Sequence, residues 1–256
     1  MKILLTNDDG IQSPGLQLLK QALEREHEVW VVAPESNRSA SSHAITLREP
    51  TRIREYAKRE FQCGGTPADC VLIGLLGLLP GDIDLVISGV NLGPNLGTDI
   101  IYSGTAAGAR QGALMGKPAL ACSLNAYTPP FNLEVPVAYI TEKAETLKRL
   151  WNGDHFLNIN FPGDVAADAA VEITYPIQRI YEDELVRFRA PNGHLYCFID
   201  GSLPRAEMET GSDFLAVEEG RISISPVLIH PTNHEIEQHY RQALCSGDRR
   251  DGSREK

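Results

Sequence analysis

Short apolar segments alternate with segments of helical periodicity along the first part of the chain, and this alternation restricts the possible folds more than any other feature. Residues 2–6 (KILLT), 28–33 (EVWVVA) and 83–88 (IDLVIS) are largely apolar over consecutive positions rather than at every second position. Strands of this kind are buried on both faces, and the helices between them must cover those faces. The sequence therefore predicts an α/β fold in which a mostly parallel sheet has helices on both sides.

The other expected elements of this first part follow the same plan. Helices are expected over 14–26, 66–79, 105–115 and 136–151, and further strands over 118–123 and 156–161. We therefore assign residues 1–165 to one core unit.

The second part of the chain has shorter runs. Two of them, 184–190 and 194–199, flank Pro191-Asn192-Gly193, and this pattern predicts a β-hairpin. Such a hairpin is either an oligomerisation arm or an ordinary ribbon at the edge of the fold. We expect residues 166–245 to form a C-terminal extension that carries the hairpin and returns to the core, and 246–256, which contain no apolar side chain, to be a disordered tail.

Charge and composition exclude several classes of protein. With 24 basic and 34 acidic residues the formal net charge is −10, whereas a protein that binds nucleic-acid polymers needs a basic face. The apolar segment 71–79 is far shorter than the ~20 residues that span a bilayer, so no membrane partner is expected. The N-terminal apolar run is too short for a signal peptide, and the five scattered cysteines contain no CxxC pair. We expect a soluble, cytoplasmic protein.

The loop after the first predicted strand reads Asn7-Asp8-Asp9-Gly10. In an open parallel sheet, ligands bind outside the carboxyl ends of the strands, so this loop is a candidate site. Two adjacent carboxylates repel each other in a dry crevice unless a cation lies between them. The alternative is a helix N-cap beside a solvated neighbour, which explains one aspartate better than two.

Two later loops, 35–43 and 88–97, also follow predicted strands and are rich in hydroxyl and amide side chains. The second of them leads into Ser103-Gly104-Thr105, where a helix of small residues begins. Backbone N–H groups at a helix start form an anion site, although turn glycines and helix capping would explain the same residues.

Together the three loops offer oxygen ligands, with His43 as the one imidazole in them. Such a set suits Mg²⁺ or Mn²⁺, with Ca²⁺ as an alternative, and does not suit zinc. A divalent ion beside an anion site indicates phosphate chemistry. The P-loop motif and GxGxxG are absent, and Asn7 occupies the position where a haloacid-dehalogenase-type phosphatase would have its nucleophilic aspartate.

Several of these segments occur in the order and spacing of one known family. Four segments lie within residues 7–112: NDDGIQSPG, VVAPESNRSASSHAITL, GTPADC and SGVNLGPNLGTDIIYSGTAAGARQG. A fifth, DFLAVEEGRISISPV, follows at 213–227. The chain resembles the survival protein SurE family. The resemblance implies a Rossmann-like, doubly wound core and a metal-dependent phosphatase that acts on nucleoside monophosphates as a 5′-nucleotidase. It also implies 3′-nucleotidase and short-chain polyphosphatase activity in some members, and dimers or tetramers formed through C-terminal extensions.

Carried over to this sequence, the resemblance assigns one divalent metal ion per subunit and a phosphate site. The implied metal ligands are Asp8, Asp9, Ser39 and Asn91. The implied phosphate-binding residues are Asn95, Ser103, Gly104 and Thr105. Two positions depart from the family pattern: Ala40 replaces the glycine of NRSG, and Thr98 replaces an acidic residue.

The expected reaction is direct attack of water on the phosphate, without a covalent intermediate. Asp8 or Asp9 would accept the proton of the water, and His234 is a weak candidate for protonating the leaving alcohol. A receiver-like signalling module is the first rival, but its acceptor aspartate should end the third core strand, where 83–88 runs into Gly89. A catalytically silent nucleotide sensor is the second rival, and metal-dependent release of phosphate would distinguish it from an enzyme.

Overall fold

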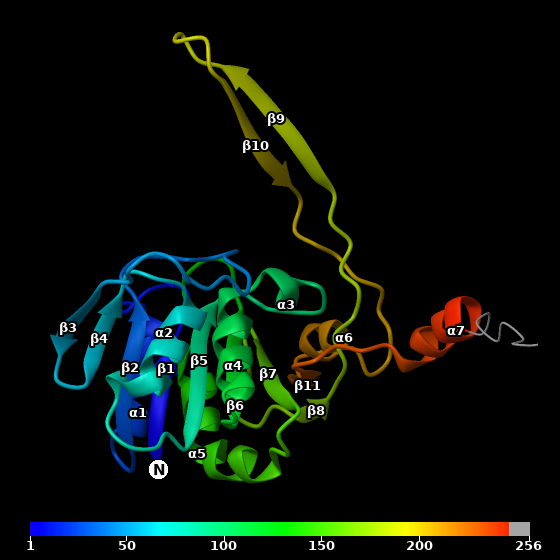
Figure 1. Ribbon diagram of the computed structural model, residues 1–256. Coiled ribbons are helices and arrows are strands. Elements are labelled where there is room, and N and C mark those ends of the chain that lie inside the picture. The colour runs from blue at the N-terminus through cyan, green and yellow to red at the C-terminus, as the bar shows by residue number, and fades with distance from the viewer. Residues whose placement is uncertain (246–256) are drawn as a thin grey trace, which may run out of the picture.

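A computed structural model describes residues 1–245 of the chain, except for the side chain of Glu235. In these residues one nine-stranded sheet forms the centre of the molecule (Figure 1). Across the sheet the strands are β3 (Ile53–Ala57), β4 (Glu60–Cys63), β2 (Glu28–Pro34), β1 (Lys2–Thr6), β5 (Leu85–Leu92), β6 (Ala119–Asn125), β7 (His155–Pro162), β11 (Ile222–Leu228) and β8 (Val171–Ile173). The run from β4 to β7 is parallel, which confirms the predicted fold class.

Helices cover both faces of the sheet. On one face lie α1 (Pro14–Leu23) and α5 (Glu134–Leu150), and on the other lie α2 (Pro67–Ile73) and α4 (Gly104–Leu114). One buried core joins the sheet to α1 and α5, and a second joins it to α2 and α4. Because both faces of the central strands are covered, their residues are apolar at consecutive positions.

The helix expected over 66–79 is shorter than predicted. A capping box at Thr66 and Asp69 starts α2, which ends at Ile73. A π-helical turn, η1 (Gly74–Leu78), follows, and in it Gly77 has a φ of 147°. Glycine adopts this backbone conformation without a steric penalty. The turn η1 therefore takes the place of the last part of the helix that the apolar periodicity suggested.

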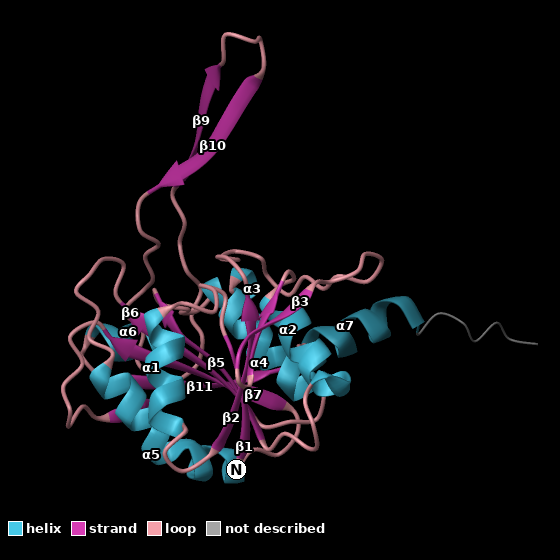
Figure 2. Cartoon of the chain, turned by 90° about the vertical axis from the view of Figure 1, so that its left-hand side faces the viewer, coloured by secondary structure: helices cyan, strands magenta, loops and turns pink. Residues whose placement is uncertain are grey.

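The predicted hairpin is present and stands away from the sheet. Its strands are β9 (Asp183–Arg189) and β10 (Leu195–Gly201), which pair antiparallel, and every residue in them is exposed. Figures 1 and 2 show this ribbon extending beyond the rest of the fold in both views. Aromatic rings stack along it, with Phe188 between Tyr196 and Phe198.

The chain after the hairpin adds one strand, β11, to the sheet. β11 pairs antiparallel with β7 and parallel with β8. The remaining elements are α3 (Asp99–Tyr102), α6 (Asp213–Glu218) and α7 (His234–Cys245). The tail predicted over 246–256 lies outside the described residues.

Two further expectations concern the five cysteines and the membrane-spanning capacity of the helices. Cys63, Cys70 and Cys122 are buried free thiols, whereas Cys197 and Cys245 are exposed. Across residues 1–245, every helix is too short or too polar to cross a membrane.

Candidate functional site

The candidate site lies where the order of the strands reverses. From β1 the chain proceeds to β2 and β4 on one side, and β5, β6 and β7 follow on the other side. The loops after β1 and β5 therefore diverge and leave a crevice at the carboxyl ends of these two neighbouring strands, which is the ligand position in doubly wound sheets. A cavity of about 520 Å³ lies there.

The cavity brings together residues from all three predicted loops. Five of the predicted site residues line it: Asp8, Ser39, Asn91, Asn95 and Ser103. Asp9, Gly104 and Thr105 belong to the same loops and do not line the cavity itself.

Asp8 is held at the first turn of α4. Its side chain is buried, and its Oδ1 accepts a hydrogen bond of 2.5 Å from the Thr105 hydroxyl. Burial raises the pKa of Asp8, while the Thr105 hydroxyl and the amides of Thr105 and Gly104 oppose that rise. Gly104 is required here, because a Cβ at this position would lie 2.9 Å from Oδ2 of Asp8.

Asp9 lies beside a second carboxylate in a half-buried position. Burial, followed by the negative charge of Asp8, raises the pKa of Asp9 to about 6, and a backbone hydrogen bond of 3.3 Å from Leu92 to Oδ2 opposes this. Within residues 1–245, neither aspartate forms an ion pair with a lysine, arginine or histidine. Two uncompensated neighbouring carboxylates favour a bound cation.

Asn91 is positioned by an irregularity in β5. The pairing of β5 with β6 shifts register between Ser88 and Asn91, and such a bulge redirects the side chain that follows. The Nδ2 of Asn91 donates to the Gly93 carbonyl over 2.8 Å, which leaves its Oδ1 as an acceptor. The sequence placed Asn91 in a loop, whereas the structure places it near the end of an extended strand.

Ser39 enters the site through the loop after β2. Arg38 ties this loop to the first one, because its backbone N–H donates to the Asp8 carbonyl over 2.7 Å. The guanidinium of Arg38 also donates to the Gly64 carbonyl. Ser39 itself is exposed, and it lines the same cavity as the buried Asp8.

These donors fit a hard divalent cation. The described residues contain no group of three or more His, Cys, Asp and Glu side chains that could share a metal. A metal at this crevice would therefore be held by two carboxylates together with hydroxyl and amide oxygens, a set that suits Mg²⁺ or Mn²⁺.

Asn95 is fixed by a buried polar network that the sequence reading missed. Its backbone N–H donates to Oδ1 of Asn160, and its carbonyl accepts from the side-chain amides of Asn158 and Asn160. Its Nδ2 donates to the Ser123 hydroxyl over 2.8 Å. The two asparagines at alternate positions of β7 were the available signal, since buried amides in an apolar strand must find partners.

The start of α4 supplies the other predicted anion-binding residues. The Oγ of Ser103 caps this eleven-residue helix by accepting from the Ala106 N–H over 2.9 Å. The Thr105 hydroxyl already donates its hydrogen bond to Asp8. Of the three residues, Ser103 is the one that faces the cavity.

One wall of the cavity is aromatic, which the sequence did not predict. Tyr102 and Tyr181 both line it, with their ring centroids 6.2 Å apart and their planes nearly perpendicular. The Tyr181 hydroxyl donates to Asp99, which also pairs with Arg179 at 3.2 Å. Asp183 and Ile199, at the root of the hairpin, complete this side.

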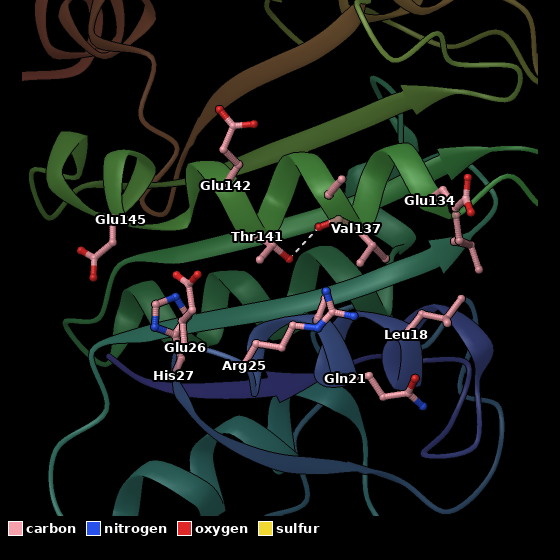
Figure 3. Close-up of a pocket in the computed structure, with 13 residues that line it drawn as sticks. Leu18, Gln21, Arg25, Glu26, His27, Glu134, Val137, Thr141, Glu142 and Glu145 are labelled. Carbon is pink, nitrogen blue, oxygen red and sulfur yellow. Dashed lines mark hydrogen bonds between the residues drawn. The ribbon is translucent and has the colours of Figure 1, made fainter.

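Two other features lie apart from the site. His234 begins α7, where its side chain is 80% exposed beside Glu237, and it does not line the cavity. A separate cavity of about 730 Å³ lies between α1 and α5 (Figure 3). None of its lining residues belongs to the predicted site.

Comparisons with known proteins agree with this architecture. The model of the Survival protein SurE family matches residues 3–183. A 5′-nucleotidase SurE of Kosmotoga olearia is 39% identical over 254 residues, covering 97% of this chain and 100% of the relative. One of Herpetosiphon aurantiacus is 40% identical over 253 residues, covering 95% of this chain and 98% of the relative.

A solved structure agrees as well. The SurE protein of Aquifex aeolicus superposes with a TM-score of 0.82 at 32% identity, covering 95% of this chain and 99% of that chain. Sequence and fold match over nearly the full length, and the chain belongs to the Survival protein SurE family.

Proposed function

We propose that this protein is a metal-dependent phosphatase that hydrolyses nucleoside monophosphates as a 5′-nucleotidase. The observation that carries the proposal is the crevice at the reversal of strand order, where Asp8, other oxygen-bearing side chains and the start of α4 line one cavity and Asp9 lies next to it in the same loop. The relatives named 5′-nucleotidase SurE support it. We extend it to 3′-nucleotides and short-chain polyphosphate as further substrates.

One Mg²⁺ or Mn²⁺ ion per subunit would be held by Asp8, Asp9, Ser39 and Asn91. When bound, it supplies Lewis-acid stabilisation of the phosphoryl oxygens and lowers the pKa of a bound water. Other residues of the chain hold the proposed metal ligands in place. Thr105 fixes the Asp8 carboxylate, and Arg38 fixes the loop of Ser39 against the Asp8 backbone.

The attacking water would lose its proton to Asp8 or Asp9. Asp8 is tightly held by Thr105, whereas Oδ2 of Asp9 accepts a longer bond of 3.3 Å from Leu92. Asp9 is therefore the freer of the two carboxylates to accept a proton.

The phosphate would be bound by Asn95 and Ser103, with Gly104 and Thr105 completing the start of α4. Asn95 cannot turn freely, because Asn158, Asn160 and Ser123 hold it. A donor fixed in this way stabilises the charge that develops in the transition state without having to reorganise. One preorganised donor of this type lowers the activation free energy by about 3 to 4 kcal/mol.

The nucleoside would lie against Tyr102 and Tyr181. Tyr102 is 55% exposed and directly precedes Ser103, so a base could stack on its ring while the phosphate reaches the helix start. Stacking of a base on an aromatic side chain contributes roughly 1 to 3 kcal/mol. This wall favours a nucleotide over a simple phosphate ester.

The test is phosphate release from AMP and GMP by the purified protein, with EDTA, Mg²⁺ or Mn²⁺ present. We expect release with a divalent ion and none with EDTA; nucleotide binding without any release would support the silent sensor instead. The same screen with 3′-AMP and short polyphosphate tests the two further activities.

The aromatic wall is tested by the ratio of kcat/KM for AMP to that for ribose 5-phosphate. Tyr102→Leu should lower this ratio about tenfold. Tyr56→Leu, on the outer strand β3, should leave it unchanged. An unchanged ratio in Tyr102→Leu would place the base elsewhere.

We also propose that the protein acts in the cytoplasm as a homodimer or homotetramer assembled through the C-terminal extension. The hairpin supports this, because its exposed apolar side chains include Phe188, Phe198 and Ile199. Sedimentation of the full chain, compared with Ile199→Asp, would measure its contribution.

A further inference from the structure

A third cavity shares the short helix α3 with the candidate active site. Its volume is about 620 Å³, within the range of small-molecule sites. It is lined by residues of α3, α4, the segment 176–178 and the end of β11. Its walls are largely apolar, with Ile100, Ile177, Val227 and Ile229 among them.

Arg110 of α4 is the one charged side chain among the residues that line this cavity. Its guanidinium lies 5.4 Å from the centroid of the Phe156 ring. Within the described side chains it forms no ion pair, and its pKa is lowered by burial alone, without a carboxylate to oppose the effect. By contrast, the buried Arg179 pairs with Asp99.

The polar groups around Arg110 do not compensate its charge. The Ser42 hydroxyl donates to the Ile101 carbonyl, and the Thr98 hydroxyl accepts from the Arg179 N–H. His43 lies close enough for Arg110 to contribute to the lowering of its pKa, after the larger effect of burial. A half-dehydrated guanidinium with no acidic partner, in a chain of net charge −10, is costly unless an anion binds it.

We propose that this cavity binds a small organic anion, whose carboxylate or phosphate group pairs with Arg110 and whose apolar body packs against Ile100, Ile177 and Val227. An arginine pairs with either group through two parallel hydrogen bonds. The exposed amide of Gln178 lies at the same cavity and supplies a further donor.

This site is distinct from the candidate active site. Ile100 and Ile101 line the Arg110 cavity, while Asp99 and Tyr102, on the same short helix, line the other one. An anion at Arg110 therefore leaves the acidic pair accessible. The proposal holds whether or not the protein is a nucleotidase, and a binding measurement without nucleotide separates the two.

Isothermal titration of the full chain with sodium octanoate, octylphosphonate and octan-1-ol tests the proposal. We expect both anions to bind with a stoichiometry near one, and octanol to bind at least about tenfold more weakly. Binding of octanoate alone would indicate a carboxylate ligand. Tighter binding of octylphosphonate than of octanoate would indicate a phosphate ligand, and both outcomes support the site.

Arg110→Gln should weaken the binding of both anions about tenfold or more, because it removes the charge and keeps hydrogen-bonding capacity. Its melting temperature should equal or exceed that of the parent chain, since an uncompensated charge is removed. Arg25→Gln, in the cavity between α1 and α5, is the matched control and should leave anion binding unchanged.

Three results would overturn the proposal. Binding that is equal in Arg110→Gln and the parent chain would show that the anion lies elsewhere. Weaker binding in Arg25→Gln alone would assign it to the other cavity. Absence of binding, together with dissociation of an oligomer in Arg110→Gln, would show that a second copy of the chain covers this face.

Discussion

The hydroxyl of Thr105 donates a hydrogen bond of 2.5 Å to Oδ1 of Asp8, although the two residues are 97 positions apart in the chain. This contact joins the loop after β1 to the first turn of α4. The family resemblance implies a phosphate-binding role for Thr105 and a metal-binding role for Asp8. The structure connects the two proposed functions through one hydroxyl group.

Thr105→Val should therefore weaken metal binding without unfolding the protein. The variant keeps the volume of the side chain and removes the donor that orients Asp8, and loss of such a supporting contact typically costs 10- to 100-fold in metal affinity. The Mn²⁺ concentration for half-maximal phosphate release from AMP measures the effect.

The matched control is Thr141→Val on α5, where the hydroxyl bonds only to the Val137 carbonyl of its own helix. It should not change the Mn²⁺ requirement. If Thr105→Val also had a parental requirement, Asp8 would not depend on Thr105 for its orientation.

Asp8→Asn and Asp9→Asn should each abolish phosphate release from AMP and GMP at matched Mn²⁺. Either change removes one of the two charges that hold the cation, and it also removes the repulsion between neighbouring carboxylates. The melting temperature in EDTA at pH 7 should accordingly be unchanged or higher. Near-parental turnover in either variant would contradict the metal assignment.

Asn160→Ala should lower both stability and activity. It leaves the backbone N–H of Asn95 without its buried acceptor, a loss of about 1 to 3 kcal/mol in the free energy of unfolding. Because Asn95 then loses its fixed position, kcat/KM for AMP should also fall. Urea denaturation and initial rates measure the two effects, and the exposed Asn132→Ala should change neither.

Asp84→Asn should produce a pH-dependent loss of stability. A hydrogen bond from Lys148, followed by one from the Lys2 backbone, lowers the pKa of Asp84 below its ordinary value of 3.8. A lowered pKa means that the charged form stabilises the folded state above the ordinary pKa, and that this contribution is lost as the pH falls through the lowered value.

The groups are partly exposed, so we expect a difference of only about 0.5 to 1 kcal/mol at pH 7. The unfolding free energies of the parent chain and Asp84→Asn should converge as the pH falls through the lowered pKa of Asp84. The exposed Asp168→Asn carries the same charge change and should show a smaller difference. A difference that does not shrink as the pH falls below the ordinary pKa would exclude a titrating contribution from Asp84.

The central fold was predictable because its strands are apolar on both faces. Residues 2–6 coincide with β1, and 28–33 lie within β2. β3 and β4 were missed because their pattern is weaker: four of the five residues of β3 are exposed, as expected for an edge strand. β5 is longer than predicted because the chain remains extended through Gly89 and a bulge.

The site was predictable as three loops and not as a cavity. Strand ends and hydroxyl-rich segments located the three loops, and the family resemblance selected Ser39 and Asn91 within them. The Tyr181 wall depends on a segment that returns from the second part of the chain, and the Asn158–Asn95 contact crosses from β7 to the loop after β5. Contacts between segments this far apart leave no local sequence pattern, so the sequence alone does not predict them.

The reversal of strand order has a consequence for folding. Because β5 lies beside β1, the first contacts of the site join residues about eighty positions apart, such as Leu92 and Asp9. Contacts of high sequence separation form late, since the entropy of closing the loop must be lost first. An ion held at this crevice would bind only chains that have completed the sheet. By mass action it would raise the melting temperature with its concentration, which makes ligand affinity and thermal stability two measurements of one equilibrium.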